Sequence, residues 1–492
     1  MSHETLDAAA GTLPAEAIDA IERAATSAHR HEELFSERAA NIRQSAVRDV
    51  FDISMRPGLV SLAGGSPYLQ SLPLDRLAAT AAKIIAEDGL TALQYGSGQG
   101  SEELRTQICE VMAAEGITDA LPQNVVITAG SQSAQDVATK VFCNPGDVVL
   151  VEDPTYVGAL NTFEAYQVQV ETVEMDDEGL VPEQLEARIA ALQLAGKNIK
   201  FLYTIPNFNN PSGITLAAGR RQRIVDICRS ANILVVEDNP YGLLRFSGEP
   251  LAPLRAANPD DVIYMGSFSK IFAPGLRIGW ALVPEHLQRR YYLAAEAVTL
   301  CPPAFNQMLV SAYLRDYDWR GQIETYRGLY AERCAALLAA LEEHMPPGTT
   351  WTRPEGGFFV WVTLPEGVDT YPLLRKAIDA GVVSLSPVAS VTRPRTVPLV
   401  VGCCAQPIAA AKNSAINKTA KRFMRPLKQK IGLNLFLKTN INLIPAARKT
   451  SDTNENARLK RLAFSFKPKI YRQLKNSFNA FKKSCFEGLF FF

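Results

Sequence analysis

Histidine, lysine and long apolar runs are all scarce in the first four-fifths of this 492-residue sequence. The five histidines form no H-E-x-x-H motif and none stands in a glycine-rich context, so acid–base chemistry falls to another residue type. The eight cysteines show no C-x-x-C spacing, which argues against the common zinc and disulfide frameworks and favours reduced thiols. We therefore expect no metal site.

No apolar stretch approaches the roughly 18 residues that a membrane-spanning helix needs. The N-terminal segment is acidic and lacks the charged-then-apolar pattern of a secretory signal. With 47% hydrophobic and 21% charged residues, the composition is that of a soluble globular protein. The formal net charge is zero, so we expect a cytoplasmic protein with neither a membrane nor a nucleic acid as partner.

The zero net charge conceals two different compositions. Residues 405–492 hold 19 Lys and Arg against 3 Asp and Glu, whereas the preceding part has an equal excess of acidic residues. Only six lysines precede residue 405, and 13 follow it. One of the six, Lys270, lies in GSFSKIFAPGLRIGW and therefore calls for an explanation.

Apolar, β-branched runs alternate with helical stretches between about residues 90 and 285. The runs are NVVITAG (124–130), DVVLVEDP (147–154), IKFLYTIP (199–206), NILVVEDNP (232–240), DVIYMGSFS (261–269) and LRIGWALVP (276–284). Near-continuous apolar strands that alternate with helices predict an α/β fold with a mainly parallel sheet covered on both faces. Ligands bind such sheets at the carboxyl ends of the strands, so the residues after each run are the candidates.

Two of these strand ends suggest charge recognition. After NVVITAG, Gly130, Ser131 and Gln132 begin a helix whose backbone N–H groups and serine hydroxyl favour a phosphate; an ordinary serine cap is the alternative. Asp238 ends the run NILVVED, where a buried carboxylate needs a cationic partner; a turn-forming aspartate is the alternative.

The other two strand ends carry a turn and a lysine. Asn210 lies in the turn NFNNPSG, which has no need of a function. Lys270 follows SFS, with Arg277 downstream, and a solvated lysine is the alternative reading of that position. A desolvated lysine, however, becomes a nucleophile toward aldehydes, and arginine supplies a fixed fork for phosphate.

Together the four strand ends describe one ligand, pyridoxal 5'-phosphate (PLP). PLP has a phosphate, an aldehyde and a ring nitrogen. It withdraws electrons from the substrate only while the ring nitrogen is protonated, and a neighbouring aspartate keeps that proton in place. On this hypothesis Lys270 carries the aldehyde as a Schiff base and then moves the substrate proton.

Four motifs, TAGSQSAQD, NNPSG, EDNPYG and SFSKIFAPGLRIGW, resemble those of the class I/II aminotransferases in order and spacing. VSLAGGSPYLQSLPLD (60–75) and LQYGSGQGSEELR (93–105) resemble the subgroup of 2-aminoadipate transaminases and the aminotransferase domains of MocR regulators. The resemblance runs from about residue 40 to 380. It implies the three-layer fold type I, with a large domain around a mainly parallel mixed sheet and a smaller α+β domain.

The resemblance also implies roles for single residues. Lys270 matches the Schiff-base lysine, Asp238 the partner of the pyridine nitrogen, and Tyr241 and Asn210 the partners of the ring hydroxyl. The aromatic stacked on the ring matches Tyr156. The phosphate shell matches Ser131, Gln132, Ser267, Ser269 and Arg277, and Gly130 is a further cofactor-binding position.

A homodimer with shared active sites follows from the same resemblance. Tyr95 matches a tyrosine that reaches the phosphate in the neighbouring subunit. Gly65 and Arg48 stand where the subgroup contacts substrate, together with Asn210, although an exposed helix arginine is the plain alternative for Arg48.

The C-terminal part departs from the family. PEGGFFVWVTLPEG (354–367) resembles the first strand of the small domain, but no L-R-L-x-F context follows with the arginine that grips the substrate carboxylate; neither Arg393 nor Arg395 fits it. We expect an N-terminal helical arm (1–60), a PLP-binding domain (61–300), a partial small domain (301–381) and an atypical basic tail (382–492), disordered or frameshifted. A reading-frame slip near Gly381 explains the break, since shifted codons for Val382 to Val388 can spell the missing V-P-G turn; a genuine fused basic tail is the alternative.

The sequence therefore predicts a PLP-dependent aminotransferase that moves an amino group between an α-amino acid and a 2-oxo acid. A C–S lyase or a decarboxylase on the same scaffold is the chemical alternative, because the cofactor permits each reaction. A regulatory or inactive homologue that lacks the carboxylate-binding arginine is the second alternative.

Overall fold

The computed structural model describes residues 31, 34–41, 60–62, 65–365, 382–383 and 399–402. Its helices are α2 (Glu37–Asn41), α4 (Leu74–Ala92), α5 (Glu102–Ala113), α6 (Ser131–Phe142), α7 (Val157–Ala165), α8 (Pro182–Leu194), α9 (Ala218–Ser230), α10 (Glu285–Thr299), α11 (Ala304–Asp316) and α12 (Trp319–His344). Short 3-10 turns lie at η2 (Leu69–Ser71), η3 (Pro122–Asn124), η4 (Gly242–Leu244), η5 (Leu254–Ala257) and η6 (Pro274–Leu276).

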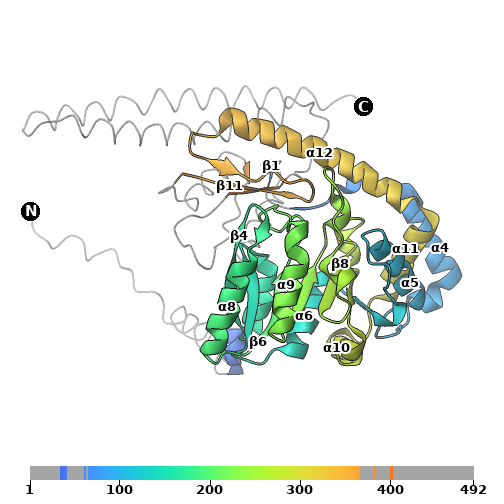
Figure 1. Cartoon of the computed structure of the whole chain (residues 1–492). Coiled ribbons are helices and arrows are strands. Elements are labelled where there is room, and N and C mark those ends of the chain that lie inside the picture. The colour runs from blue at the N-terminus through green and yellow to red at the C-terminus, as the bar shows by residue number, and fades with distance from the viewer. Residues whose placement is uncertain are drawn as a thin grey trace, which may run out of the picture. The chain divides into compact units, whose positions relative to one another are not determined.

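An eight-stranded mixed sheet forms the centre of the described chain (Figure 1). Its order is β2 (Val125–Thr128), β9 (Gly279–Leu282), β8 (Val262–Ser267), β7 (Leu234–Asp238), β6 (Ile199–Thr204), β3 (Val148–Asp153), β4 (Gln169–Asp176) and β5 (Gly179–Leu180). The five central strands from β8 to β4 are parallel, and β9 runs antiparallel to both of its neighbours. The α/β fold with a mainly parallel sheet is confirmed, and all six apolar runs form strands.

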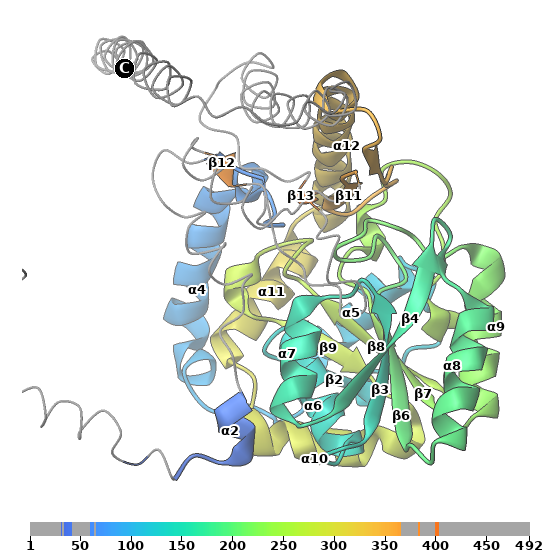
Figure 2. The ribbon, with the colours of Figure 1, turned by 90° about the vertical axis from the view of Figure 1, so that its left-hand side faces the viewer.

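Helices cover both faces of the sheet, with α8 and α9 on one side and α6, α7 and α10 on the other (Figure 2). Alternate residues of β3 enter two separate hydrophobic clusters. Val149 and Val151 pack with residues of α6 and α7, whereas Val148 and Leu150 pack with residues of α8 and α9. Each fully buried aliphatic side chain stabilises the fold by about 1.5–3 kcal/mol, so burial on both faces explains the unbroken apolar runs.

A smaller sheet has the order β10 (Thr350–Trp351), β11 (Phe359–Thr363) and β13 (Leu399–Gly402), all antiparallel. A further pair joins β1 (Val60–Ser61) to β12 (Val382–Val383) in parallel. The hairpin that links β10 and β11 contacts the large sheet's loops, since Thr352 donates a hydrogen bond to the carbonyl oxygen of Ser212 at 2.8 Å. The small sheet therefore lies against the NFNNPSG turn.

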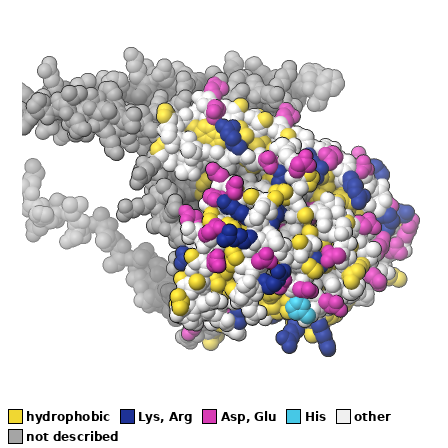
Figure 3. All heavy atoms as spheres, in the orientation of Figure 1, with side chains coloured by type: hydrophobic (Ala, Val, Ile, Leu, Met, Phe, Trp, Pro, Cys, Tyr) yellow, Lys and Arg dark blue, Asp and Glu magenta, His cyan; other side chains and the backbone are white. Residues whose placement is uncertain are grey.

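Basic and acidic side chains intermingle on the face of the described chain shown in Figure 3. No helix among residues 31–365 that the structure describes is long and apolar enough to cross a membrane. The five cysteines in the described part, Cys109, Cys143, Cys228, Cys301 and Cys334, are free thiols.

Candidate active site

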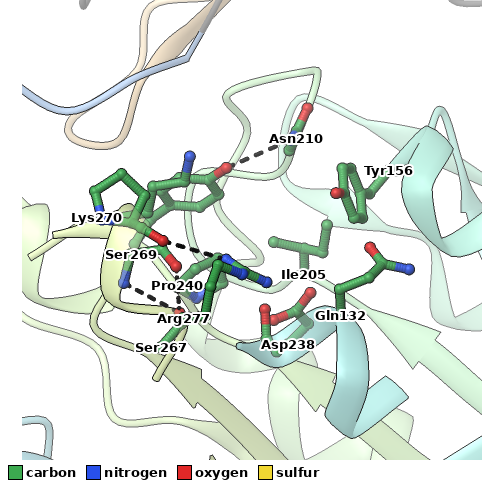
Figure 4. A pocket seen from close by; sticks show the side chains of 13 residues that line it. Gln132, Tyr156, Ile205, Asn210, Asp238, Pro240, Ser267, Ser269, Lys270 and Arg277 are labelled. Atoms are coloured by element: carbon green, nitrogen blue, oxygen red, sulfur yellow. Dashed lines mark hydrogen bonds between the residues drawn. The ribbon is translucent and has the colours of Figure 1, made fainter. Parts of the chain in front are cut away.

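A pocket of about 190 Å³ opens at the carboxyl ends of the parallel strands, where the sequence pattern predicts the ligand (Figure 4). It brings together residues from six chain segments that are far apart in sequence. The lining residues are Ser131, Gln132, Tyr156, Ile205, Asn210, Asp238, Pro240, Tyr241, Ser267, Ser269, Lys270, Pro274 and Arg277. Ten of these thirteen residues are predicted from the sequence.

The N-terminus of α6 and a serine pair form one end of the pocket. No side chain caps this helix at Gly130, whose φ of 84° is in the left-handed region that glycine tolerates. Ser267 donates a hydrogen bond to Ser269 at 2.8 Å, and the backbone N–H of Ser269 donates to Ser267 at 3.1 Å. Uncapped helix N–H groups and two hydroxyls suit an anion.

Arg277 closes this anion-binding end against the helix. Its Nη2 donates a hydrogen bond to the carbonyl oxygen of Ala129 at 2.8 Å. A Cβ built on Gly130 would lie 2.4 Å from the same nitrogen, so the guanidinium approaches the helix N-terminus only because residue 130 is glycine. Arg277 itself has a φ of 52°, a backbone conformation that non-glycine residues rarely adopt.

Asp238 ends β7 and lies at the base of the pocket with 5% of its surface exposed. Tyr203 on β6 donates its hydroxyl proton to Oδ2 at 2.8 Å, while Oδ1 has no hydrogen-bond partner among the described residues. Burial raises the pKa of this carboxyl to about 6, and the Tyr203 hydroxyl and the nearby Lys270 charge oppose that rise. The carboxylate is thus ionised at neutral pH and has one oxygen available for a ligand.

Lys270 follows β8 after two intervening residues, and its Nζ donates a hydrogen bond to the carbonyl oxygen of Gly65 at 2.9 Å. The same nitrogen lies 5.5 Å from the ring centroid of Phe358. Gly65 has a φ of 50°, and a Cβ there would meet the Phe359 ring at 2.6 Å. Gly65 therefore lies beside the lysine without lining the pocket, and its contact with substrate stays a prediction.

The remaining wall consists of the NFNNPSG turn and the loop after β3. The amide of Asn210 donates to the hydroxyl of Tyr241 at 3.4 Å (Figure 4). Buried Glu152 fixes this turn, because its two oxygens accept hydrogen bonds from Thr204 at 2.6 Å, the Ile205 N–H at 2.9 Å and Asn209 at 2.7 Å. The phenol of Tyr156 has a pKa raised chiefly by burial, so it stays neutral.

Three predicted residues lie outside this arrangement or differ from it. Tyr95 is 77% exposed and does not line the pocket of its own chain. Arg48 lies outside the described residues. Gln132 lines the pocket, but its amide nitrogen donates to the Gly158 carbonyl at 3.0 Å and to Thr162 at 2.6 Å, and so links α6 to α7.

Sequence reasoning missed Tyr203, Ile205, Pro240 and Pro274. Pro240 and Pro274 lie within the quoted motifs EDNPYG and SFSKIFAPGLRIGW, and Ile205 ends an apolar run. Tyr203 lies inside a buried strand, where a tyrosine is ordinarily a packing residue. Its position one residue before the strand end is the only signal, because it lies inside the strand and not among the polar residues that follow it.

The residues fit PLP on three features of the pocket. The uncapped helix N-terminus with Ser131, Ser267, Ser269 and Arg277 suits the phosphate. The Oδ1 of Asp238, which has no hydrogen-bond partner among the described residues, suits a protonated ring nitrogen, and the Lys270 amine suits the aldehyde. Within the described ranges, no cluster of three or more His, Cys, Asp or Glu could hold a metal ion.

Comparison with known proteins yields one family. The sequence model of the family described as "Aminotransferase class I and II" matches residues 58–401. The aromatic-amino-acid aminotransferase 1 of Thermococcus litoralis is 39% identical over 353 residues, which cover 72% of this chain and 85% of that protein. The 2-aminoadipate transaminase of Thermus thermophilus is 36% identical over 355 residues, covering 71% and 86%.

Two solved structures have the same fold. The kynurenine aminotransferase of Pyrococcus horikoshii, in complex with PMP, KYN as substrates and KYA as products, superposes with a TM-score of 0.76 at 36% identity. The α-aminoadipate aminotransferase LysN of Thermus thermophilus, complexed with N-(5'-phosphopyridoxyl)-L-leucine, superposes with a TM-score of 0.73 at 32% identity. Each match covers 82% of this chain and 99% of the other. The resemblance to fold type I aminotransferases and to the 2-aminoadipate subgroup is confirmed.

Proposed function

The chain belongs to the class I and II aminotransferases and is PLP-dependent, and from this premise we propose how its own residues transfer an amino group between an α-amino acid and a 2-oxo acid. When bound, PLP withdraws electrons from the substrate's Cα and carries the amino group between the two half-reactions. One observation carries the proposal. The N-terminus of α6, which suits an anion, the buried carboxylate of Asp238 and the amine of Lys270 all line one pocket.

Four residues hold the phosphate in this proposal. The hydroxyls of Ser131, Ser267 and Ser269 donate hydrogen bonds, and Arg277 supplies the compensating charge beside the N-terminus of α6. Arg277 is already oriented by its bond to the Ala129 carbonyl, which lowers the entropic cost of binding.

Asp238 holds a proton on the ring nitrogen through Oδ1. Because the carboxylate is buried, a cation placed next to it is attracted more strongly than one in water. Tyr241 and Asn210, which are hydrogen-bonded to each other, would hold the ring at its hydroxyl, and Tyr156 would exclude water from one face.

Lys270 would hold the cofactor's carbonyl through Nζ and, as a free amine, would accept the proton of the substrate's Cα and return it. The Gly65 carbonyl, 2.9 Å from Nζ, and the Phe358 ring, whose centroid is 5.5 Å from Nζ, fix where this amine lies in the pocket.

We propose amino acids with large side chains, aromatic or 2-aminoadipate, as amino donors. The support is the names of the relatives, an aromatic-amino-acid aminotransferase and a 2-aminoadipate transaminase. Gly65 and Arg48 are the proposed substrate contacts, with Asn210. Phe359 lies next to Gly65 and 6.1 Å from the Tyr241 ring, which adds an apolar surface on this side.

A homodimer with shared sites is the proposed assembly. Leu90, Leu93 and Tyr95 are 95%, 75% and 77% exposed, and they continue toward Leu300, whose carbonyl lies 3.1 Å from a Cβ built on Gly98. Several exposed apolar side chains in one part of the chain favour a protein interface. In this assembly the partner's Tyr95 completes each phosphate site.

Subunit mixing tests the shared site. Tyr95→Ala and Lys270→Ala each impair both sites of their own dimers, but a mixed dimer contains one site with both residues intact. Refolding the two variants together should restore roughly a quarter of the wild-type activity through random pairing. Activity no greater than that of the separate variants contradicts shared sites.

The domain boundaries and the cytoplasmic location also remain proposals. We propose the arm at 1–60, the PLP-binding domain at 61–300, the partial small domain at 301–381 and the atypical tail from 382. The first part of that tail keeps family structure, because the family match reaches residue 401 and β12 and β13 pair with β1 and β11. The free thiols in the described part support a reducing compartment. Sequencing the gene tests the tail, because one uninterrupted frame in agreement with relatives contradicts a frame slip.

A visible absorbance spectrum of the purified chain with PLP tests the function. A band that depends on Lys270, and so disappears in Lys270→Ala, is expected because the lysine binds the carbonyl. Aromatic amino acids, kynurenine and 2-aminoadipate are then added singly, and loss of the band with formation of the 2-oxo acid confirms transamination. A band that no amino acid changes means that the chain binds the cofactor without turning over.

A further inference from the structure

Tyr203 is a buried tyrosine one residue before the end of β6, on the strand next to the one that ends in Asp238. Its side chain has no exposed surface, and its hydroxyl donates to Oδ2 of Asp238 at 2.8 Å. The two residues are 35 positions apart, so only the pairing of β6 with β7 brings them together.

Packing fixes the position of this hydroxyl. The ring of Tyr203 meets that of Phe163 on α7 edge to face, with centroids 5.8 Å apart and an interplanar angle of 76°. Both rings belong to the large hydrophobic cluster between the sheet and α6 and α7. The phenol therefore cannot turn away from Asp238 without disturbing that cluster.

The two oxygens of Asp238 consequently differ. Oδ2 accepts from Tyr203, whereas Oδ1 has no partner in the part of the chain that the structure describes. We propose that Tyr203 is a positioning residue, whose hydroxyl holds Asp238 in one rotamer and in its ionised form so that Oδ1 alone meets the protonated ring nitrogen of PLP. This inference rests on the proposed function of the same pocket.

The charges around Asp238 support this role. Lys270, Arg277 and Tyr156 line the same pocket, and Glu152 lies near Tyr203 on the side of β3. Burial and the neighbouring Asp238 charge raise the pKa of Tyr203 well above its ordinary value, so its hydroxyl keeps its proton and remains a donor. Lys270 and the Tyr203 hydroxyl are the two groups that lower the pKa of Asp238 against the effect of burial.

Removing the Tyr203 hydroxyl should raise the pKa of Asp238. The ionised form of Asp238 loses one of its two stabilising groups, so the pKa of the carboxyl rises further above about 6. Below the new pKa the carboxyl is protonated and no longer attracts the ring N–H. Cofactor binding should therefore weaken at mildly acidic pH and recover at higher pH.

The experiment measures the dissociation constant of PLP from pH 5.5 to 9 for the wild type and Tyr203→Phe, by quenching of intrinsic fluorescence. The substitution keeps the ring and its contacts with Phe163. The pH at which binding weakens should move up by about one pH unit, with about tenfold weaker binding near that point and near-equal binding at pH 9, since a hydrogen bond to a charged group is worth about that much.

Tyr291→Phe is the matched control, because Tyr291 is also fully buried but donates its hydroxyl to the Ala134 carbonyl at 2.5 Å instead of to Asp238. It should leave the pH profile unchanged. In an Asp238→Asn background, Tyr203→Phe should have no pH-dependent effect. An equal loss at every pH, or no loss at any pH, overturns the positioning role.

Two outcomes distinguish a failure of the proposed function from a failure of the proposed role of Tyr203. If the wild type fails to bind PLP, the proposed function fails, whereas a wild type that binds PLP with an unmoved Tyr203→Phe profile contradicts only the role of Tyr203. If Tyr203→Phe does not fold, 3-fluorotyrosine at position 203 provides a second test. As a stronger donor of the same shape, it should move the profile to lower pH, and an unmoved profile overturns the proposal.

Discussion

Two adjacent carboxylates at the end of β7 have opposite surroundings. Glu237 has no exposed surface, and its two oxygens accept hydrogen bonds from the Leu254 and Arg255 backbone N–H groups, each at 2.9 Å. Asp238, one residue later, faces the pocket with one oxygen bound by Tyr203 and the other without a described partner. A saturated buried carboxylate stabilises the fold, whereas a half-saturated one is available to bind a ligand.

Removing the negative charge of Asp238 should have the largest effect on activity. Asp238→Asn keeps the size of the side chain but cannot hold a proton on the ring nitrogen, so kcat should fall about 10³-fold, as when a preorganised electrostatic group is lost. Steady-state kinetics with saturating PLP measures this loss, and thermal unfolding should show an intact fold. A variant with near-normal kcat means that Asp238 does not act on the cofactor.

Removing the carboxylate of Glu237 should lower stability and leave PLP binding nearly unchanged. Glu237→Ala leaves the buried N–H groups of Leu254 and Arg255 without acceptors, so the free energy of unfolding should fall by about 3 kcal/mol. Urea unfolding measures the loss. PLP affinity of the folded fraction should change little, and a selective loss of PLP binding without loss of stability contradicts the comparison.

Two glycines extend the contrast to the phosphate end. Gly130 and Gly146 share a φ of 84°, but a Cβ at Gly130 would lie 2.4 Å from Arg277, whereas one at Gly146 meets nothing within 4 Å. Both Gly130→Ala and Gly146→Ala place an alanine at a positive φ, which costs on the order of 1 kcal/mol or more. Only Gly130→Ala should weaken PLP binding, by about tenfold, because it displaces the guanidinium; equal affinities for the two variants contradict this role of Arg277.

A third buried carboxyl group, that of Glu115, should make the stability of the protein depend on pH. Glu115 accepts from Tyr264 and from Asn239 at 3.4 Å beneath the loop that follows Asp238, and burial raises its pKa to about 8. A raised carboxyl pKa means that stability is present below the unfolded-state value, near 4.3, and is lost as pH rises toward about 8. Wild type should therefore lose up to about 1.4 kcal/mol per pH unit across that range relative to Glu115→Gln.

Urea unfolding of the two proteins from pH 5 to 9 checks this slope, with the apoprotein used throughout so that cofactor binding does not contribute. A difference between wild type and Glu115→Gln that stays constant across the range means that Glu115 is ionised throughout.

Most of the pocket was predictable because parallel strands bring their carboxyl ends to one edge. Ser131, Asp238, Asn210 and Lys270 each follow an apolar run directly or within a short turn, and the pocket unites all four. The strands β4 and β5 were not predicted, since β4 has several exposed or half-buried residues and lacks a continuous apolar run. Tyr203 was missed for the opposite reason, because it lies within such a run.

The sequence by itself determined the α/β architecture, the edge of the sheet where the ligand binds, and the set of residue types that suits PLP. Local patterns suffice for these, because strand and helix periodicity and motif spacing are properties of short segments. Only the tertiary structure decided which hydrogen-bond partners Glu237 and Asp238 have, and that Tyr203 is the tyrosine that donates to Asp238. Both faces of the sheet are buried, so alternation along β7 does not distinguish them, and the partners of each carboxylate come from other strands and loops.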